Sequence, residues 1–317
     1  MTFESCILAV HNEALASGAL VFTQTTTEVL YQDGVAFNVR LAPSLASKPT
    51  GNTEAVGVQR APPSNPFLPY DRALLVEELK EHVVLLNKYC VIPGHIILAT
   101  KAFVPQTNPP DVADFTAVWY CMRRAQTRPF ITFYNCGKES GASQPHKHLQ
   151  LLPMESDDIN SPPIFKLIEQ VPSHPDVPFR VPEFKFVHAC AHLSLDTTVI
   201  APDAATGTPQ TPEQHDAATG RALHRTFLSL ANAVNLNLGA VPEDDAFQSY
   251  NLILTRHFML LVPRKHESVQ SVPVNSLGLA GLFLAKSHEQ MNILKHSSIL
   301  QLYQALTFPV DAEADGA

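Results

Sequence analysis

Short runs of β-branched and aliphatic residues constrain the fold of this chain more than any other sequence feature. Residues 82–86 (HVVLL) and 95–100 (HIILAT) are two such runs, separated by eight residues that end in Pro93-Gly94. This pattern predicts two neighbouring strands of an antiparallel sheet. Residues 249–255 and 258–262 form a similar pair, and residues 129–135 and 147–154 predict two further strands.

The remaining segments predict helices and long loops. Apolar residues recur at helical spacing over 4–20, 111–127, about 213–234 and 275–294. Proline-rich stretches at 42–71 and 155–180 and the low-complexity stretch 201–220 predict surface loops. The order of these elements favours an α+β fold, with an antiparallel sheet, helices packed against one face of it, and loop-rich insertions.

Composition limits the class of protein. The chain has 317 residues, 45% of them apolar, and a formal net charge of −8. We expect no nucleic-acid partner, because a phosphate backbone requires clustered Lys and Arg, whereas a local basic pocket for a small phosphorylated ligand is compatible with this charge. Five cysteines without CxxC spacing indicate reduced thiols. Because no signal-peptide pattern and no bilayer-spanning apolar run is present, we expect a soluble intracellular protein with no membrane partner.

One segment carries most of the chemistry. Side chains alternate between the faces of a strand, so His146, His148 and Gln150 are expected to share one face of strand 147–154. A turn of small residues directly precedes them, with the sequence Ser140-Gly141-Ala142-Ser143. Small residues allow backbone amides to approach an anion closely, and the two hydroxyl groups add donors.

Three interpretations of the His-x-His pair remain open from these residues alone. The two imidazoles could ligate one metal ion, although no third ligand lies nearby in the sequence. They could instead form a structural pair that is satisfied by hydrogen bonds. The third interpretation is a nucleophilic histidine with helper groups, which the adjoining small-residue turn and Gln150 favour.

The segment SGASQPHKHLQ resembles the active-site strand of the histidine-triad superfamily in its transferase form. More narrowly, it resembles the fungal diadenosine tetraphosphate phosphorylase (ATP adenylyltransferase) family. Residues 65–71 (NPFLPYD), 82–101 (HVVLLNKYCVIPGHIILATK) and 249–264 (SYNLILTRHFMLLVPR) are similar to other parts of that family. The motif His-x-His-x-Gln alone would also suit relatives of galactose-1-phosphate uridylyltransferase.

The resemblance implies a reversible nucleotidyl transfer in which His148, His146 and Gln150 are catalytic. His148 would attack the α-phosphorus of the dinucleotide and expel ATP, and phosphate would then release ADP from an adenylyl-histidine. Sulfate in place of phosphate would give ADP sulfurylase activity. A neutral imidazole is required, so one ring nitrogen must donate to a fixed acceptor, which the resemblance places at a backbone carbonyl near His146. Gln150 can only form hydrogen bonds, which suits an intermediate that waits for phosphate.

The resemblance also implies a set of substrate-binding residues in the proline-rich loop, at the strand ends and in the small-residue turn: Lys48, Asn87, Lys88, Asn135, Ser140, Gly141, Ala142, Ser143, Gln150, Asn251, Thr255 and Arg264. The alternative for those outside the turn and the motif is ordinary loop or cross-strand hydrogen bonding and surface charge. Two other functions remain open, namely a dinucleoside polyphosphate hydrolase of the histidine-triad type and a non-catalytic nucleotide-binding module.

Organisation and partners follow from the same resemblance. Residues 1–180 are expected to carry the catalytic strand, residues 181–310 to complete the same sheet, and residues 311–317 to form an acidic tail. The expected ligands are a dinucleoside polyphosphate, ATP, ADP and phosphate. No tightly bound cofactor or protein-held metal is expected, and any Mg²⁺ would arrive with the nucleotide. The chain is expected to be a monomer in the cytoplasm and also the nucleus.

Overall fold

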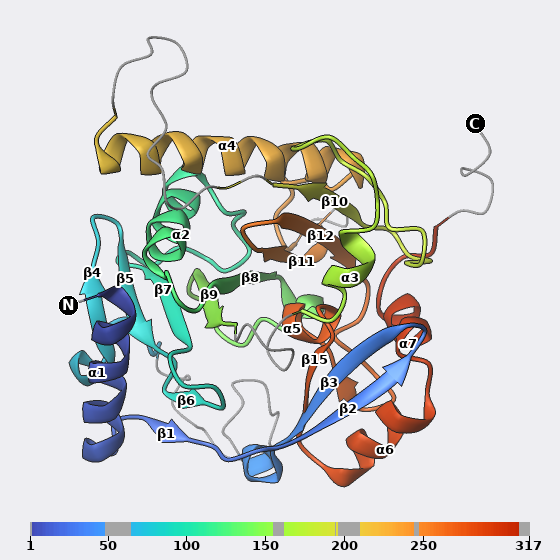
Figure 1. The fold of residues 1–317 in the computed structure, drawn as a ribbon, viewed down its shortest axis with the longest axis horizontal. Helices are drawn as coiled ribbons and strands as arrows, with labels where there is room; N and C mark the ends of the chain where they lie inside the picture. The colour runs from blue at the N-terminus through green and yellow to red at the C-terminus, as the bar shows by residue number, and fades with distance from the viewer. Residues whose placement is uncertain are drawn as a thin grey trace.

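A large antiparallel sheet forms the centre of the molecule (Figure 1). The structure, a computed structural model, describes residues 2–47, 65–154, 162–193, 195, 210–243 and 247–310. Eight strands lie in the order β10-β12-β11-β8-β9-β7-β5-β4, and every neighbouring pair is antiparallel. They are β4 (Leu75–Glu78), β5 (His82–Leu86), β7 (Ile96–Thr100), β8 (Phe130–Cys136), β9 (His148–Pro153), β10 (Ala189–His192), β11 (Ser249–Leu254) and β12 (Phe258–Arg264). The predicted α+β class and the predicted strand pairs are confirmed.

Three long helices cover the first face of this sheet. They are α1 (Phe3–Ser17), α2 (Val112–Arg124) and α4 (Pro212–Ala233), and their apolar residues share one buried cluster with β5, β7, β8 and β11. Each begins at a residue whose side chain accepts backbone N–H groups, namely Thr2, Asp111 and Thr211. The helix α4 starts inside the stretch 201–220 that was expected to be a loop, because the capping box of Thr211 with Gln214 and Pro212 at the first turn initiate it.

The second face is also covered, which the expectation of helices against one face did not include. A three-stranded sheet in the order β15-β3-β2 packs there with four short helices around a second apolar cluster. These elements are β2 (Thr26–Gln32), β3 (Val35–Leu41), β15 (Leu282–Ala285), α3 (Phe165–Ile168), α5 (Ser276–Leu279), α6 (His288–His296) and α7 (Ile299–Leu306). Strands β2 and β3 lie beside α6 and α7 in Figure 1.

The single helix predicted over 275–294 is wrong. The chain forms α5, then β15, then α6, because Gly281 adopts φ +90° and ends the first helix. Residues of β15 then pair in parallel with β3, and Ser287 caps α6 by accepting from Gln290 N at 3.2 Å. Tertiary strand pairing therefore overrides a helical pattern of apolar residues here.

Smaller elements complete the structure. They are β1 (Val21–Phe22), β6 (Tyr89–Cys90), β13 (Ser268–Val269), β14 (Val272–Pro273) and three 3₁₀ turns, η1 (Pro43–Ser47), η2 (Arg72–Leu74) and η3 (Lys138–Ser140). Within the described part of the chain, no helix combines the length and the apolar character that a membrane span requires.

Strand β9 lies near the middle of the sheet, between β8 and β7. Leu149 and Leu151 of β9 pack into the cluster beneath the long helices. On the other face of β9, His148 and Gln150 lie opposite Ala99 and Ile97 of β7. Ala99 and Ile97 belong to a small apolar cluster. His148 and Gln150 are therefore two polar residues on this face, and they lie between the small cluster and the larger apolar cluster around β3 and β15.

Candidate active site

The strand β9 places His148 and Gln150 on the same face, as the alternation predicts. His148 lies opposite Ala99 of β7, and Gln150 lies opposite Ile97 of β7 and Phe133 of β8. The His148 side chain is buried, and the Phe67 ring packs at 5.0 Å between centroids. The imidazole is therefore held between an aromatic ring and the sheet.

One hydrogen bond fixes the chemistry of His148. Its Nδ1 lies 2.9 Å from the carbonyl oxygen of His146, and because a carbonyl only accepts, Nδ1 must carry the proton. Burial lowers the pKa of His148 from 6.5 to about 4, so the ring is neutral at pH 7. No described residue forms a hydrogen bond with Nε2, which leaves that lone pair for another molecule.

The first histidine is held on both ring nitrogens. His146 Nε2 donates to the carbonyl oxygens of Thr100 at 2.9 Å and Ala102 at 3.0 Å, and Nδ1 accepts from Asn65 Nδ2 at 2.9 Å. Burial also lowers the pKa of His146. The ring is fully buried and its nitrogens are occupied, so the contribution of His146 runs through its carbonyl oxygen and its backbone.

Gln150 differs from His146 in both burial and hydrogen bonding. Its side chain is only partly buried, and no described residue forms a hydrogen bond with its carboxamide. The donor and the acceptor of this carboxamide, which lie on the same face as His148, therefore have no partner among the described residues.

Two glycines shape the turn before the motif. Gly137 and Gly141 both have φ +80°, a conformation that favours glycine. A Cβ on Gly137 would collide with Ser249 Oγ, and a Cβ on Gly141 would lie 3.1 Å from Asn275 Cβ. The turn therefore packs against β11 and α5 more closely than any other residue type would allow.

The backbone amides of this turn divide into two groups. Those of Ser140 and Gly141 donate within the turn, and Ser140 Oγ donates to Gly137 O at 2.6 Å. In the described part of the chain, no acceptor is found for the amides of Ala142, Ser143 and Gln144. These amides and the exposed Ser143 can meet an anion.

A buried polar network holds the turn to the sheet. Asn251 Nδ2 donates to Asn135 Oδ1 at 2.8 Å, to Ser140 O at 3.0 Å and to Ser276 Oγ at 3.0 Å. Arg264 donates to Asn251 Oδ1 and to Val274 O. Burial lowers the pKa of Arg264 to about 10, which leaves it cationic at neutral pH.

Family models match nearly the whole chain. The model for the Ap4A phosphorylase N-terminal domain matches residues 1–170, and the model for the ATP adenylyltransferase C-terminal domain matches residues 182–309. The chain belongs to the Ap4A phosphorylase family. Within this family the chain is 28% identical over 292 residues to Diadenosine 5',5'''-P1,P4-tetraphosphate phosphorylase 2 of Saccharomyces cerevisiae, covering 86% of this chain and 80% of the relative.

Solved structures give the same fold. The crystal structure of yeast Ap4A phosphorylase Apa2 in complex with AMP matches with a TM-score of 0.75 and 23% identity, covering 98% of this chain and 100% of that one. The structure of Apa2 in complex with Ap4A also matches with a TM-score of 0.75, at 24% identity and 98% coverage of each chain. The Ap4A phosphorylase fold thus extends over both sequence halves, whose strands share one sheet.

Several residues predicted for this Ap4A phosphorylase site are brought together, and others are not. Asn135, Ser140, Asn251 and Arg264 meet in the network, but Asn251 and Arg264 are 0% and 2% exposed. Their polar groups form hydrogen bonds within the protein and support the turn, and direct substrate contact by either side chain stays a prediction. Thr255 lies at the other end of β11, where its Oγ1 accepts from the amides of His257 and Phe258 at 3.1 and 3.2 Å in the hairpin turn.

The two residues predicted to contact the nucleotide at the end of β5 do not lie beside His148. Asn87 binds His95 Nδ1 at 3.1 Å and accepts from Tyr89 N at 3.2 Å, while Lys88 is exposed. The β5–β7–β9 register places Asn87 two strands from the catalytic strand. Lys48 lies outside the described residues.

Sequence reasoning missed several residues of the site. Asn65 binds the His146 ring, Ser276 binds Asn135, and Gln106 binds the backbone of His148. Two of them had a signal in the sequence. Asn65 belongs to the segment NPFLPYD, which resembles the family, and Asn275-Ser276 is a typical sequence for the start of a helix. Gln106 stands in the loop sequence VPQTNPP and has no such signal.

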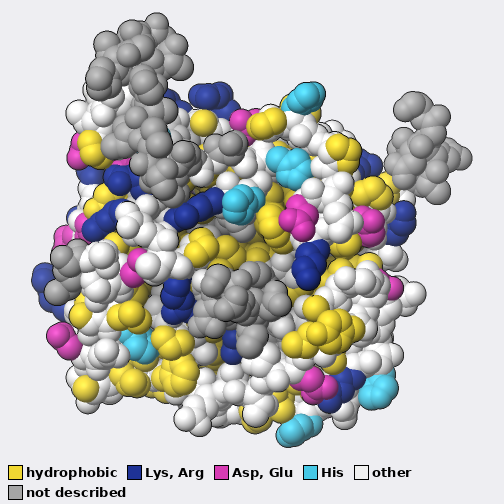
Figure 2. Space-filling view, in the orientation of Figure 1, with side chains coloured by type: hydrophobic (Ala, Val, Ile, Leu, Met, Phe, Trp, Pro, Cys, Tyr) yellow, Lys and Arg dark blue, Asp and Glu magenta, His cyan; other side chains and the backbone are white. Residues whose placement is uncertain are grey.

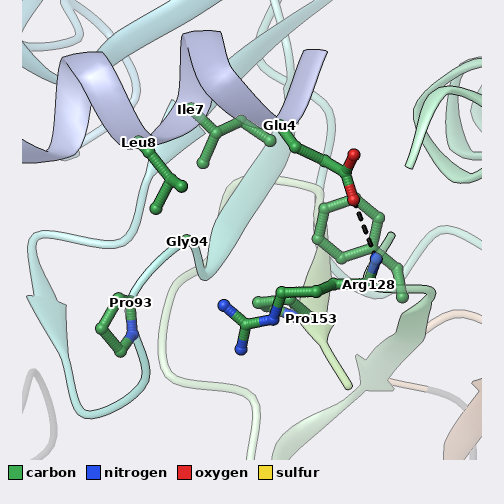
Figure 3. A pocket seen from close by; sticks show the side chains of 8 residues that line it. Glu4, Ile7, Leu8, Pro93, Gly94, Arg128 and Pro153 are labelled. Carbon is green, nitrogen blue, oxygen red and sulfur yellow. Dashed lines mark hydrogen bonds between the residues drawn. The ribbon is translucent and has the colours of Figure 1, made fainter. Parts of the chain in front are cut away.

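Outside this site, the described structure differs from it in cavities, charge and potential metal ligands. A small open depression of about 30 Å³ is lined by residues of α1, Gly94, Arg128 and Pro153 (Figure 3). On the face drawn in Figure 2, the coloured Lys and Arg side chains are spread among hydrophobic and acidic ones. Among the described residues, no three His, Cys, Asp or Glu side chains converge as metal ligands.

Proposed function

We propose that this member of the family cleaves diadenosine tetraphosphate with phosphate to give ATP and ADP, through an adenylyl group carried on His148. The observation that carries the proposal is the 2.9 Å bond from His148 Nδ1 to the His146 carbonyl. It fixes the neutral tautomer with an unprotonated Nε2, which is what a nucleophilic imidazole requires.

In the first step, His148 Nε2 attacks an α-phosphorus. An N–P bond forms, the bond from that phosphorus to its bridging oxygen breaks, and ATP leaves with the electron pair. The imidazole becomes cationic, and the His146 carbonyl stabilises the proton on Nδ1. In the second step, a phosphate oxygen attacks the same phosphorus, the N–P bond breaks, ADP leaves and His148 returns to its neutral form.

The groups around His148 support these displacements. The amides of Ala142, Ser143 and Gln144 and the carboxamide of Gln150 are donors without described partners. Donors that are already oriented stabilise the charge that develops on phosphoryl oxygens. Gln150 has no titrating group, so it does not activate water against the intermediate. We further propose that any Mg²⁺ enters with the nucleotide, and that sulfate competes with phosphate as acceptor.

The experiment mixes the purified chain with diadenosine tetraphosphate in the absence of phosphate. Intact-protein mass spectrometry is expected to find one added adenylyl group, and peptide mapping is expected to place it on His148. Adding phosphate should then release ADP. The His148→Ala variant should show neither the adduct nor turnover, with activity lower by at least about 10³-fold.

The alternatives give different products. AMP formed without phosphate would support the hydrolase and overturn the phosphorylase proposal. Binding of the dinucleotide without any product, by the wild-type chain, would support the non-catalytic module.

A further inference from the structure

The strands β8 and β9 separate just before the nucleophile. Their last paired residues are Phe133 and Gln150, and the same register continued by two residues would pair Asn135 with His148. Strand β8 instead stays with β11 as far as Cys136. The edge of β9 at His148 is thereby left open towards β8, although its backbone is buried.

The carboxamide of Gln106 occupies this opening and replaces the missing ladder bonds. His148 N donates to Gln106 Oε1 at 2.8 Å, and Gln106 Nε2 donates to Asn135 O at 2.8 Å and to His148 O at 3.2 Å. One planar amide thus satisfies both strands, as a peptide group of an inserted strand would.

Gln106 is itself fixed from several sides. Its amide donates to Pro145 O at 2.8 Å, Lys147 N donates to Val104 O at 2.7 Å, and Tyr134 Oη donates to the Gln106 carbonyl. The residue is only 4% exposed. Its carboxamide therefore cannot relax by turning into water.

We infer that Gln106 is a positioning residue for the nucleophile, acting through the backbone of His148. The inference rests on the proposed function. The ring of His148 is tied to the carbonyl only two residues before it, so a shift of the His148 backbone changes the direction in which Nε2 points. Misplacement of a reacting group by about 1 Å costs about 10²-fold in rate.

Only a carboxamide fits the three bonds. Oε1 faces a donor, whereas Nε2 faces two carbonyl oxygens. A carboxylate at this position would set an anionic oxygen against those carbonyls, and only its protonated form could donate. Methionine would keep the length of the side chain and remove all three bonds.

The experiment measures the rate of His148 adenylylation in a single turnover with excess diadenosine tetraphosphate and no phosphate, at a temperature where each variant is folded. For Gln106→Met we expect this rate to fall about 100-fold, with half-saturation by the dinucleotide changed by less than about 3-fold because the turn and Gln150 stay in place. Gln106→Glu should have a rate, relative to wild type, that falls as pH rises from about 5 to about 9, because only the protonated carboxyl group donates.

A matched control separates positioning from stability. Thr226 lies in α4, on the other face of the sheet. Thr226→Val removes its part-buried hydrogen bond to Asp176 Oδ1, 3.0 Å long, and should keep the wild-type rate. Equal adenylylation rates for Gln106→Met and wild type would overturn the inference. If Gln106→Met does not fold, the inference is overturned when the rate of Gln106→Glu relative to wild type does not change with pH. Absence of any adduct on wild-type protein would overturn the proposed function instead.

Discussion

His148 Nδ1 donates to the carbonyl oxygen of His146 across a single intervening residue, at 2.9 Å. The His146 ring is in turn bound to Thr100, Ala102 and Asn65. The two histidines therefore differ: the first holds the backbone acceptor in place, and the second has a neutral ring whose Nε2 has no partner in the described part of the chain. This division explains why the first ring can be fully buried while the second needs access to a ligand.

The neutral ring gives a testable pH dependence. Burial lowers the pKa of His148 to about 4, so Nε2 remains unprotonated well below the 6.5 of an ordinary imidazole. In single-turnover adenylylation without phosphate, we expect the rate to stay level between about pH 7.5 and pH 5 and to fall only as the pH approaches 4. A half-loss near pH 6.5 would contradict this prediction.

A buried ion pair beneath the catalytic strand gives a second prediction. Lys147, between the two histidines, points to the other face and binds Asp114, which also accepts from His82 Nε2 at 2.8 Å. Burial alone would raise the pKa of Asp114, but the bonds from His82 and Lys147 hold it below 3.8. The unfolded chain therefore takes up this proton at a higher pH than the folded one, so stability is lost as pH falls below about 4.

The Asp114→Asn variant tests this contribution. It leaves Lys147 buried with only the exposed Asp111 carboxylate, 3.7 Å from its Nζ, as a charge partner, and the free energy of unfolding in urea at pH 7 should fall by about 3–5 kcal/mol. The difference from wild type should shrink below about pH 4. The double variant Asp114→Asn/Lys147→Met removes both charges and should recover much of the loss. If it remains as unstable as the single variant, the ion pair is not the cause.

The sequence allowed prediction of features with a local cause. Alternation placed His148 and Gln150 on one face of β9, and apolar runs with turn residues between them predicted β5, β7, β11 and β12. A further local signal was available but unused. Asp33 and Gly34 both have positive φ in the β2–β3 hairpin, and Asp-Gly between two strands is the typical sequence of such a turn.

Features with a distant cause could not be predicted in this way. Gln106 reaches the His148 backbone across 42 positions, and nothing in its neighbourhood distinguishes it from any loop glutamine. The strand β15 depends on β3, more than 240 positions earlier, and its apolar residues fit a helix equally well. The burial of Asn251 and Arg264 could not be predicted either, because their partners Ser140, Ser276 and Leu306 come from distant parts of the chain.

The buried network gives a third prediction. Asn251→Leu keeps the size of the side chain but removes three donated bonds and leaves Ser140 O without that donor. We expect the free energy of unfolding to fall by about 2–4 kcal/mol. Because the turn 137–143 loses its anchor, half-saturation by phosphate in the second step should also rise. A stability loss with unchanged use of phosphate would show that the network does not position the turn.

The crossing of α2 and α4 gives a fourth prediction. A Cβ on Gly220 of α4 would lie 2.8 Å from Thr116 Cα of α2. Gly→Ala inside a helix is ordinarily stabilising by about 1 kcal/mol, but here Gly220→Ala should lower the midpoint of thermal unfolding because the helices must separate. The turnover of the remaining folded protein should be unchanged, since this contact lies on the face away from His148. A raised midpoint would show that α2 and α4 adjust without cost.

The proposed function gives Gln150 the role of keeping water from reacting with the intermediate, and replacement of Gln150 tests that role. The carboxamide, which has no hydrogen-bond partner among the described residues, shares the face of His148 and cannot take up a proton, so water near the proposed intermediate has no base there. Gln150→His supplies one at the same position of β9. With phosphate present, we expect the ratio of AMP to ADP formed to rise by about 10-fold or more, within the range of general-base catalysis, while the adduct still forms on His148. Gln150→Glu is a matched control of the same length whose carboxylate also accepts a proton but repels phosphate, so it should raise the ratio further by slowing ADP formation. If wild type and Gln150→His give the same ratio of AMP to ADP, then residues other than Gln150 protect the intermediate by excluding water.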